Sequence, residues 1–184
     1  GHKGQDVDAY RVITHLGIEH VILSIEEPFD SITSGMTAEN IKVSDQTKIN
    51  LAPRLRMAML YAVSQSVNGR VANTCNLSEA YIGWETRWGD AVGDFAPLAK
   101  LTCSEVIALG RELDLPKELI EKVPADGLCG STDEEAFGFT YDELDRWIRL
   151  RVKGENYEKI KSLHERNRFK RLDLPHYSPP LVQY

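Results

Sequence analysis

The stretch that decides the fold runs from residue 70 to residue 83 and reads RVANTCNLSEAYIG. Its first five residues, 70–74, predict a short β-strand, and a helix is expected to begin at Ser78. Polar residues stand between the two. In open parallel sheets ligands bind at the carboxyl ends of strands, so these polar residues are expected to line a ligand site.

The residues before this stretch alternate between helix and strand patterns. Residues 7–16 have apolar side chains near helical spacing and are followed by a glycine, which predicts a short helix. Residues 21–25 (VILSI) then predict a buried strand. A longer helix is expected from Asn50, with an apolar stripe over residues 51–63.

The residues after the stretch are mostly helical. Thr102 and Glu105 have the spacing of a capping box, in which each side chain bonds the other's backbone N–H, and Thr140 and Glu143 repeat it. Residues 155–171 predict a last helix. Strands that alternate with helices favour an α/β fold with a mainly parallel sheet covered by helices on both faces.

Length and composition suit one globular domain, because the chain has 184 residues of which 42% are hydrophobic. We expect residues 1–184 to form that single domain, with flexible loops at 31–48 and 124–132 and a C-terminal helix and tail over 155–184. No internal repeat or low-complexity segment is evident.

The cysteine and histidine patterns predict neither disulfides nor a zinc site. Cys75, Cys103 and Cys129 are widely spaced without a CxxC pair, and the five histidines form no metal-spaced pair. No apolar run approaches the roughly 20 residues of a membrane span. A cytoplasmic protein without a membrane partner is therefore expected.

Positive charge is concentrated near the C-terminus. Residues 146–171 hold ten of the 22 Lys and Arg residues and three acids, which gives this segment +7 in a chain of net charge −6. A solvated basic helix is one interpretation. The other is a basic arm that meets an anion such as phosphate. A nucleic-acid role ranks last, because no RNA- or DNA-binding motif accompanies these residues.

Five segments together resemble the ammonia-dependent NAD synthetase family. They are INLAPRLRMAMLY (49–61), NTCNLSE (73–79), RWGDAVGDFAPL (87–98), LTCSEV (101–106) and KVPADGLCGSTDEEAFGFTYDELD (122–145). The resemblance extends over roughly residues 1 to 175. It implies a three-layer Rossmann-like fold of the adenine nucleotide α-hydrolase type. It also implies a homodimer that amidates deamido-NAD with ATP, Mg²⁺ and ammonia.

The resemblance also implies roles for individual residues. Thr74, Cys103 and Ala125 stand at ATP-binding positions, Glu79 at the magnesium-binding carboxylate, and Asp90 near the incoming ammonia as a candidate general base. The positions that match deamido-NAD ligands are Asn50, Arg54, Arg56, Tyr61, Arg87, Asp94, Phe169 and Lys170. Asp133 and Glu134 match the family's Asp-Glu after a flexible loop. Trp84 and Trp88 are interpreted as packing residues.

Some of these positions depart from the family pattern. Cys103 replaces a lysine that reaches the ATP phosphates, Ala125 replaces a threonine, Arg87 replaces a lysine, and Phe169 replaces a histidine. Arg87 and Lys170 keep a positive charge, whereas Phe169 can only stack on a ligand.

The family's phosphate-binding Ser-Gly-Gly-x-Asp-Ser loop does not occur in the 184 residues. In the family it precedes the segment that residues 1–18 resemble, so we expect an N-terminal strand, loop and helix to be missing, with poor ATP binding and little turnover. The alternative function is therefore a catalytically incomplete nucleotide-binding fragment or subunit, which needs another segment for the ATP phosphates. A glutaminase partner as nitrogen source stays open.

Overall fold

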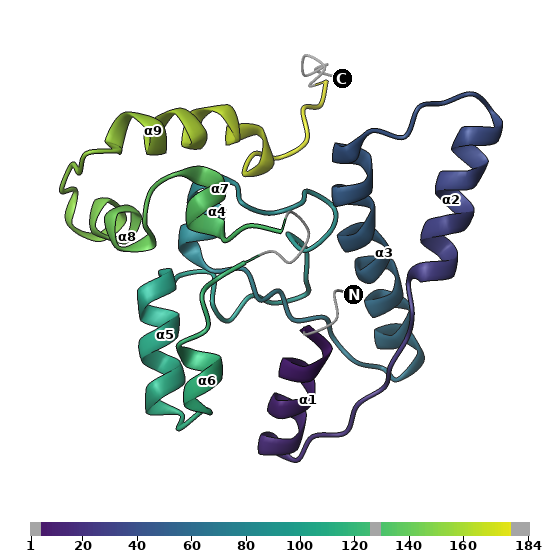
Figure 1. Ribbon diagram of the computed structural model, residues 1–184, viewed down its shortest axis with the longest axis horizontal. Coiled ribbons are helices and arrows are strands. Elements are labelled where there is room, and N and C mark those ends of the chain that lie inside the picture. The colour runs from purple at the N-terminus through teal and green to yellow at the C-terminus, as the bar shows by residue number, and fades with distance from the viewer. Residues whose placement is uncertain (1–4, 126–129, 178–184) are drawn as a thin grey trace, which may run out of the picture.

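The computed structural model describes residues 5–125 and 130–177, and helices make up its regular structure (Figure 1). The helices are α1 (Gln5–Leu16), α2 (Glu26–Ala38), α3 (Asp45–Ser66), α4 (Leu77–Ile82), α5 (Cys103–Glu112), α6 (Lys117–Ile120), α7 (Asp133–Phe137), α8 (Tyr141–Leu150), α9 (Tyr157–Arg166) and the 3₁₀ turn η1 (Arg168–Lys170). No helix in the described ranges is long and apolar enough to cross a membrane.

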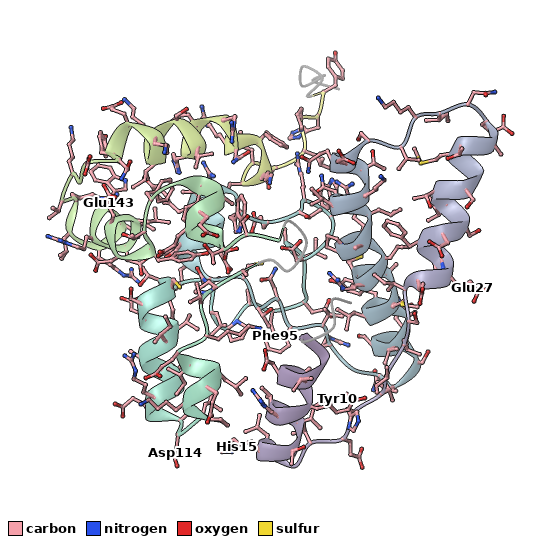
Figure 2. All side chains as sticks on the ribbon, in the orientation of Figure 1. Tyr10, His15, Glu27, Phe95, Asp114 and Glu143 are labelled. Atoms are coloured by element: carbon pink, nitrogen blue, oxygen red, sulfur yellow. The ribbon has the colours of Figure 1, made fainter. Side chains whose placement is uncertain are left out.

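The helices form two groups on either side of irregular segments (Figure 1). Helix α4 packs against α5, α8 and α9, and α5 also packs against α6 and α8. On the other side α2 packs against α3. Glu143 on α8 and Glu27 on α2 lie at opposite ends of the molecule (Figure 2).

The core belongs to the first group. It consists of Ile82, Cys103, Phe137, Phe139, Tyr141, Leu144 and Ile160, with Trp84 and Trp147 among the side chains packed around it. Phe137 contacts Trp84 edge to face at 5.5 Å between ring centroids, which confirms packing for Trp84. Trp88 is 50% exposed and does not belong to this core, although the Arg87 guanidinium lies over its ring at 4.9 Å.

Among the described residues, one isolated β-bridge is observed in place of the predicted sheet. Ala72 forms an isolated parallel bridge with Phe95, so residues 70–74 have one neighbouring segment. Residues 21–25 were predicted as a buried strand, and this is wrong for the described structure. They pair with no described segment, and Val21, Ile22 and Leu23 are 74%, 69% and 55% exposed. A strand needs partners along its backbone, which periodicity alone does not supply.

The predicted loop at 31–48 is also wrong in part, because residues 31–38 belong to α2 and α3 begins at Asp45. Hydroxyl side chains made this segment resemble a loop. In α2, however, the hydroxyls of Thr33 and Thr37 donate to the carbonyls of Phe29 and Thr33, one turn back. Such local bonds let these side chains remain within a helix.

The two helices with predicted caps start as expected, because caps are local, whereas the helix expected from Asn50 begins earlier, at Asp45, behind the cap Ser44. The predicted capping box at Thr102 and Glu105 is formed. At α8 the Thr140 hydroxyl accepts from the Glu143 N–H at 3.2 Å, but the reciprocal bond is absent. The Glu143 carboxylate instead accepts from the backbone and side-chain N–H groups of Asn156.

Candidate active site

A cavity of about 460 Å³ lies between α3, α4 and the segments that follow α4. Its lining residues are Gln46, Ile49, Asn50, Pro53, Arg56, Thr74, Cys75, Glu79, Gly83, Trp84, Glu85, Thr86, Asp90, Ala125, Asp133 and Lys170. Four carboxylates and two cations are among them. The cavity therefore combines residues from four separate parts of the chain, including the opening stretch at 70–83.

Glu79 is placed by the N-terminus of α4. Asn76 caps the helix by accepting from the Glu79 N–H at 3.0 Å, and the Glu79 carboxylate accepts from the Asn76 N–H at 2.8 Å. Burial raises the pKa of Glu79 to about 7, with the charges of Asp133 and Asp90 acting in the same direction and the Asn76 N–H opposing them. The capping box thus fixes an acid that titrates near neutral pH.

Asp90 is held by the loop that follows α4. Its Oδ1 accepts from the backbone N–H of Thr86 at 2.9 Å, and its backbone carbonyl accepts from the Asn73 side chain at 3.1 Å. The Thr86 hydroxyl in turn donates to the Asn50 side chain at 3.1 Å, which connects this loop to α3. The side chain of Asp90 is thereby oriented at the rim of the cavity, and the residue itself is exposed.

Cys75 also lines the cavity, and its thiol contacts the backbone carbonyl of Asp90 at 3.4 Å. Burial and the neighbouring charges of Asp90 and Glu79 raise the pKa of this thiol far above its usual value. A raised pKa favours the protonated thiol, which is the weaker nucleophile.

The C-terminal segment 167–171 closes the other end of α4 through donated hydrogen bonds. The Lys170 ammonium donates to the carbonyls of Gly83 at 2.7 Å and Glu85 at 2.5 Å. Asn167 donates to the carbonyl of Ile82 at 2.7 Å, and Arg171 to that of Tyr81 at 3.0 Å. These carbonyls lie at a helix end, where they lack partners within the helix. We call residues 167–171 the C-terminal clasp.

The clasp changes the interpretation of the basic region at 146–171. Of its ten cations, Lys170 and Arg171 are partly buried and donate to backbone carbonyls around α4. Burial lowers the pKa of Lys170, whereas the charges of Glu85 and Asp90 oppose that shift. Arg149 donates to the Glu105 carboxylate at 2.8 Å. Part of the basic segment therefore supports the fold itself.

Seven of the predicted site residues line the cavity: Asn50, Arg56, Thr74, Glu79, Asp90, Ala125 and Lys170. Six do not: Arg54, Tyr61, Arg87, Asp94, Cys103 and Phe169. Arg54 donates to the carbonyl of Arg87 at 3.4 Å, and the Arg87 guanidinium lies over the rings of Trp88 and Phe169. The side chains of Arg87, Trp88 and Phe169 therefore lie together.

Asp94 and Cys103 have structural contacts. The Asp94 carboxylate accepts from the Val71 N–H at 2.8 Å, which joins the two segments of the parallel bridge. Cys103 is 7% exposed in the core, and its N–H donates to the Ser78 hydroxyl at 3.0 Å. Tyr61 lies half-buried on α3. Parts of the predicted loop at 124–132, residues 126–129, lie outside the described residues.

Glu85 was not among the predicted site residues, yet it lines the cavity, and burial raises its pKa. Its place beside Glu79 and Asp90 depends on the turn after α4, where Gly83 has a positive φ of 70°. No residue pattern marks that turn as part of a cavity, although Gly83 itself is a signal of a helix end.

A family model described as NAD synthase matches residues 2–173. The chain is 37% identical over 145 residues to the "NH(3)-dependent NAD(+) synthetase" of Carboxydothermus hydrogenoformans, an alignment that covers 77% of this chain and 59% of that protein. This chain thus spans about three fifths of the length of that relative.

Two solved structures are similar to the whole chain. The NMN synthetase of Francisella tularensis matches with a TM-score of 0.87 and 35% identity, over 97% of this chain and 74% of that one. The NH3-dependent NAD synthetase of Campylobacter jejuni matches with a TM-score of 0.72 and 26% identity, over 97% and 73%. The described helices therefore have the arrangement of NAD synthetase folds.

Proposed function

This chain belongs to the NAD synthase family, and from this premise we propose that it carries out the ATP-dependent amidation of deamido-NAD to NAD with ammonia as nitrogen donor. The observation that carries the proposal is the single cavity that gathers Asn50, Arg56, Thr74, Glu79 and Asp90. These residues come from separate motifs, and only the folded chain unites them. Because the chain spans part of its relatives' length, the proposal concerns the activity to which it contributes.

The chemistry explains why the reaction needs ATP. Hydroxide is a poor leaving group, so a carboxylate is not converted directly into an amide. Transfer of an adenylyl group to the carboxylate forms a mixed anhydride and releases pyrophosphate, and attack by ammonia then displaces AMP. Thr74 at the cavity wall is assigned to ATP, and Asn50 and Arg56 on α3 to the phosphates and sugar of deamido-NAD.

Asp90 is assigned to the ammonia step. Ammonium must lose a proton before it can attack, and an oriented carboxylate can receive it. The bond from the Thr86 N–H holds one oxygen of Asp90, and the other oxygen has a long contact of 3.9 Å from the Cys75 thiol, which a nucleophile would replace. Trp84 packs against the core and lines the cavity, so it adds an apolar wall beside these polar groups.

The residues of the cavity fit a divalent cation. Four carboxylates face two cations, Arg56 and Lys170, and both nucleotide substrates bring further negative charge. Glu79 is assigned to hold Mg²⁺, which when bound offsets the charge of the phosphates. No group of three or more His, Cys, Asp or Glu side chains in the described ranges could hold a metal alone, so substrate oxygens would complete the coordination.

A separate role is proposed for Arg87, Asp94 and Phe169, which do not line the cavity. Asp94 joins the two bridged segments, and the Arg87 guanidinium lies over the rings of Trp88 and Phe169. We assign them to the outer part of the deamido-NAD site, where a ligand would extend beyond the cavity. The homodimer expected from the family would add a second wall there, with α3 as the interface helix.

A coupled assay tests the function. The chain is incubated with ATP, Mg²⁺, ammonium and deamido-NAD, and NAD, AMP and pyrophosphate are measured. A second arm adds the N-terminal segment of the Carboxydothermus relative, which tests the alternative of an incomplete subunit. Glu79→Gln and Asp90→Asn are expected to lower NAD formation by about 10²-fold or more, and the exposed-site control Lys161→Gln to leave it unchanged.

The two arms distinguish the outcomes. NAD formed only after addition of the segment would favour the incomplete subunit, and deamido-NAD binding by the chain alone would agree with it. No NAD in either arm would sink the enzyme proposal.

A second candidate substrate is nicotinate mononucleotide. The observation that favours it is the TM-score of 0.87 with an NMN synthetase, against 0.72 with an NAD synthetase. The same amidation applied to the mononucleotide would give NMN. Competing nicotinate mononucleotide against deamido-NAD in one reaction would decide between them, because the ratio of the two amides measures the ratio of kcat/KM.

A further inference from the structure

The C-terminal clasp lies against the end of α4 and places one cation at the cavity. Lys170 and Arg56 are the two Lys or Arg side chains among the lining residues. The Lys170 ammonium donates to the carbonyls of Gly83 at 2.7 Å and Glu85 at 2.5 Å. An ammonium has three donors, so these bonds to the described residues leave one donor for an anionic ligand in the cavity.

The position of this ammonium depends on how the clasp is seated. A lysine side chain has a flexible four-carbon stem, and confining that stem costs conformational entropy. Two bonds from a half-buried ammonium offset only part of that cost. The backbone that carries Lys170 must therefore be held against α4 by other contacts.

Arg171 supplies such contacts on the preceding turn of α4. Its guanidinium donates to the Tyr81 carbonyl at 3.0 Å and to the His164 carbonyl of α9 at 2.6 Å, with a longer contact to the Ala80 carbonyl at 3.4 Å. Both carbonyls belong to the last turn of a helix, where the helix itself offers no partner. Because the guanidinium is a rigid planar fork, it fixes the clasp between two helices.

The approach of the clasp to α4 is close. A Cβ atom on Gly83 would lie 2.4 Å from the Cβ of Asn167, so a larger residue does not fit there. The His164 ring stacks on the Tyr81 ring at 4.1 Å between centroids, and its Nδ1 lies 2.7 Å from the Tyr81 carbonyl. The Tyr81 carbonyl is therefore the point where α4, α9 and the clasp meet.

We propose that Arg171 is a positioning residue that keeps the Lys170 ammonium at the wall of the cavity. Arg171 does not line the cavity, so its effect on a ligand passes through Lys170. The inference rests on the proposed function and deepens it, because a residue outside the cavity then controls one of the two cations that meet the anionic substrates.

The position of Lys170 can be tested without ligand or turnover. The folded chain is acetylated with acetic anhydride at a fixed pH, and mass spectrometry compares the rate at Lys170 with the rate at the exposed Lys161. Burial lowers the pKa of Lys170, which favours the reactive amine, but the amine must leave both carbonyls before it reacts. We expect Lys170 to react about tenfold or more slowly than Lys161.

Arg171→Gln removes the guanidinium and keeps a polar side chain. It is expected to bring the rate at Lys170 to within about threefold of the rate at Lys161. Arg168→Gln is the matched control, because it removes the same charge from an exposed position of the same clasp, and we expect it to leave the rate at Lys170 unchanged. Urea unfolding of each variant verifies that the chain stays folded during acetylation.

A double-mutant cycle extends the test to ligand binding. Deamido-NAD is titrated into the unaltered chain, Arg171→Gln, Lys170→Met and the double variant, and the heat of binding is measured. We expect Arg171→Gln to weaken binding by about tenfold in the unaltered chain and by less than about twofold in the Lys170→Met background. A purely structural role of Arg171 would instead weaken binding equally in both backgrounds.

Four results would overturn the proposal. The first is a Lys170 that reacts as fast as Lys161 in the unaltered chain, and the second is an unchanged rate at Lys170 in Arg171→Gln. The third is equal exposure of Lys170 by Arg168→Gln and Arg171→Gln, and the fourth is equal weakening in both backgrounds of the cycle. Acetylation involves no nucleotide, so a chain in which Arg171 protects Lys170 but which binds no deamido-NAD would contradict the proposed function alone.

Discussion

The region from Asn76 to Asn167 and the region from Val7 to Ser66 differ sharply in how they use apolar side chains. The first region buries Ile82, Leu144 and Ile160 almost completely. In the second, Ala52, Pro53 and Ser64 are the buried residues among those described, and Val21 and Ile22 are more than two-thirds exposed. Apolar content alone therefore does not tell which region is packed.

The accessible surface area of the chain is larger than that of a compact protein of the same mass. Its accessible surface is 13071 Å², whereas a compact monomer of 20.8 kDa exposes about 8,900 Å². Exposed apolar side chains lie on α1, the segment 18–25, α2 and α3, and others, such as Leu113 and Leu150, lie in the packed region. The packed region holds most of the buried apolar side chains, whereas the open region, which supplies Asn50 and Arg56 to the cavity, leaves many of its apolar side chains exposed.

The largest expected effect is the loss of a side chain from the packed region. Leu144 is fully buried, so Leu144→Ala removes its burial and leaves a cavity, which costs about 2 to 5 kcal/mol in the free energy of unfolding. Urea unfolding followed by tryptophan fluorescence measures it. Leu60→Ala on α3 is the matched control, because Leu60 is 55% exposed. Equal losses at the two leucines would abolish the contrast between the regions.

The pH dependence of stability follows from Glu79. Its pKa is about 7 in the folded chain and 4.5 in the unfolded one, so between these values the folded state binds more protons. Stability therefore falls as pH rises from 4.5 to 7, by about 1 to 2 kcal/mol after allowance for solvent screening.

The variant Glu79→Gln isolates this effect. It retains an acceptor for the Asn76 N–H, so the capping box is kept. We expect it to be more stable than the unaltered chain at pH 8 and to lose the advantage near pH 4. Unfolding curves at several pH values measure the difference. A constant difference across the range would mean that Glu79 has an ordinary pKa.

The C-terminal clasp connects the packed region to the cavity. Lys170→Met removes two bonds to the carbonyls of Gly83 and Glu85 but keeps much of the side-chain volume. We expect a loss of about 1 kcal/mol in stability, since the ammonium is partly solvated. Hydrogen exchange should quicken at residues 83–86, and Lys161→Met on the exposed side of α9 should change neither quantity.

Features that depend on residues close together in the chain could be predicted from the sequence, and features that depend on distant residues could not. The caps of α4, α5 and α8 depend on residues three apart, so the starts of these helices were predictable. The strand at 21–25 depends on distant partners, and periodicity does not reveal them. In the site, the family motifs led to Glu79 and Asp90. The bonds from Arg171 to α4 and the stacking of Arg87 on Phe169 depend on contacts over long distances along the chain, and no local pattern encodes these.

The smallest expected effect is in the open region. Ile22→Thr replaces a side chain that is 69% exposed, so it should change the free energy of unfolding by less than about 0.5 kcal/mol. If a partner surface covers the segment 18–25, the same variant should cost more than about 1 kcal/mol when that partner is present, because apolar area is then removed from water. Unfolding of Ile22→Thr with and without the added N-terminal segment of the relative therefore measures whether this surface is covered. A loss above 1 kcal/mol in the chain alone would show that Ile22 is already packed, and the contrast between the two regions would narrow to α2 and α3.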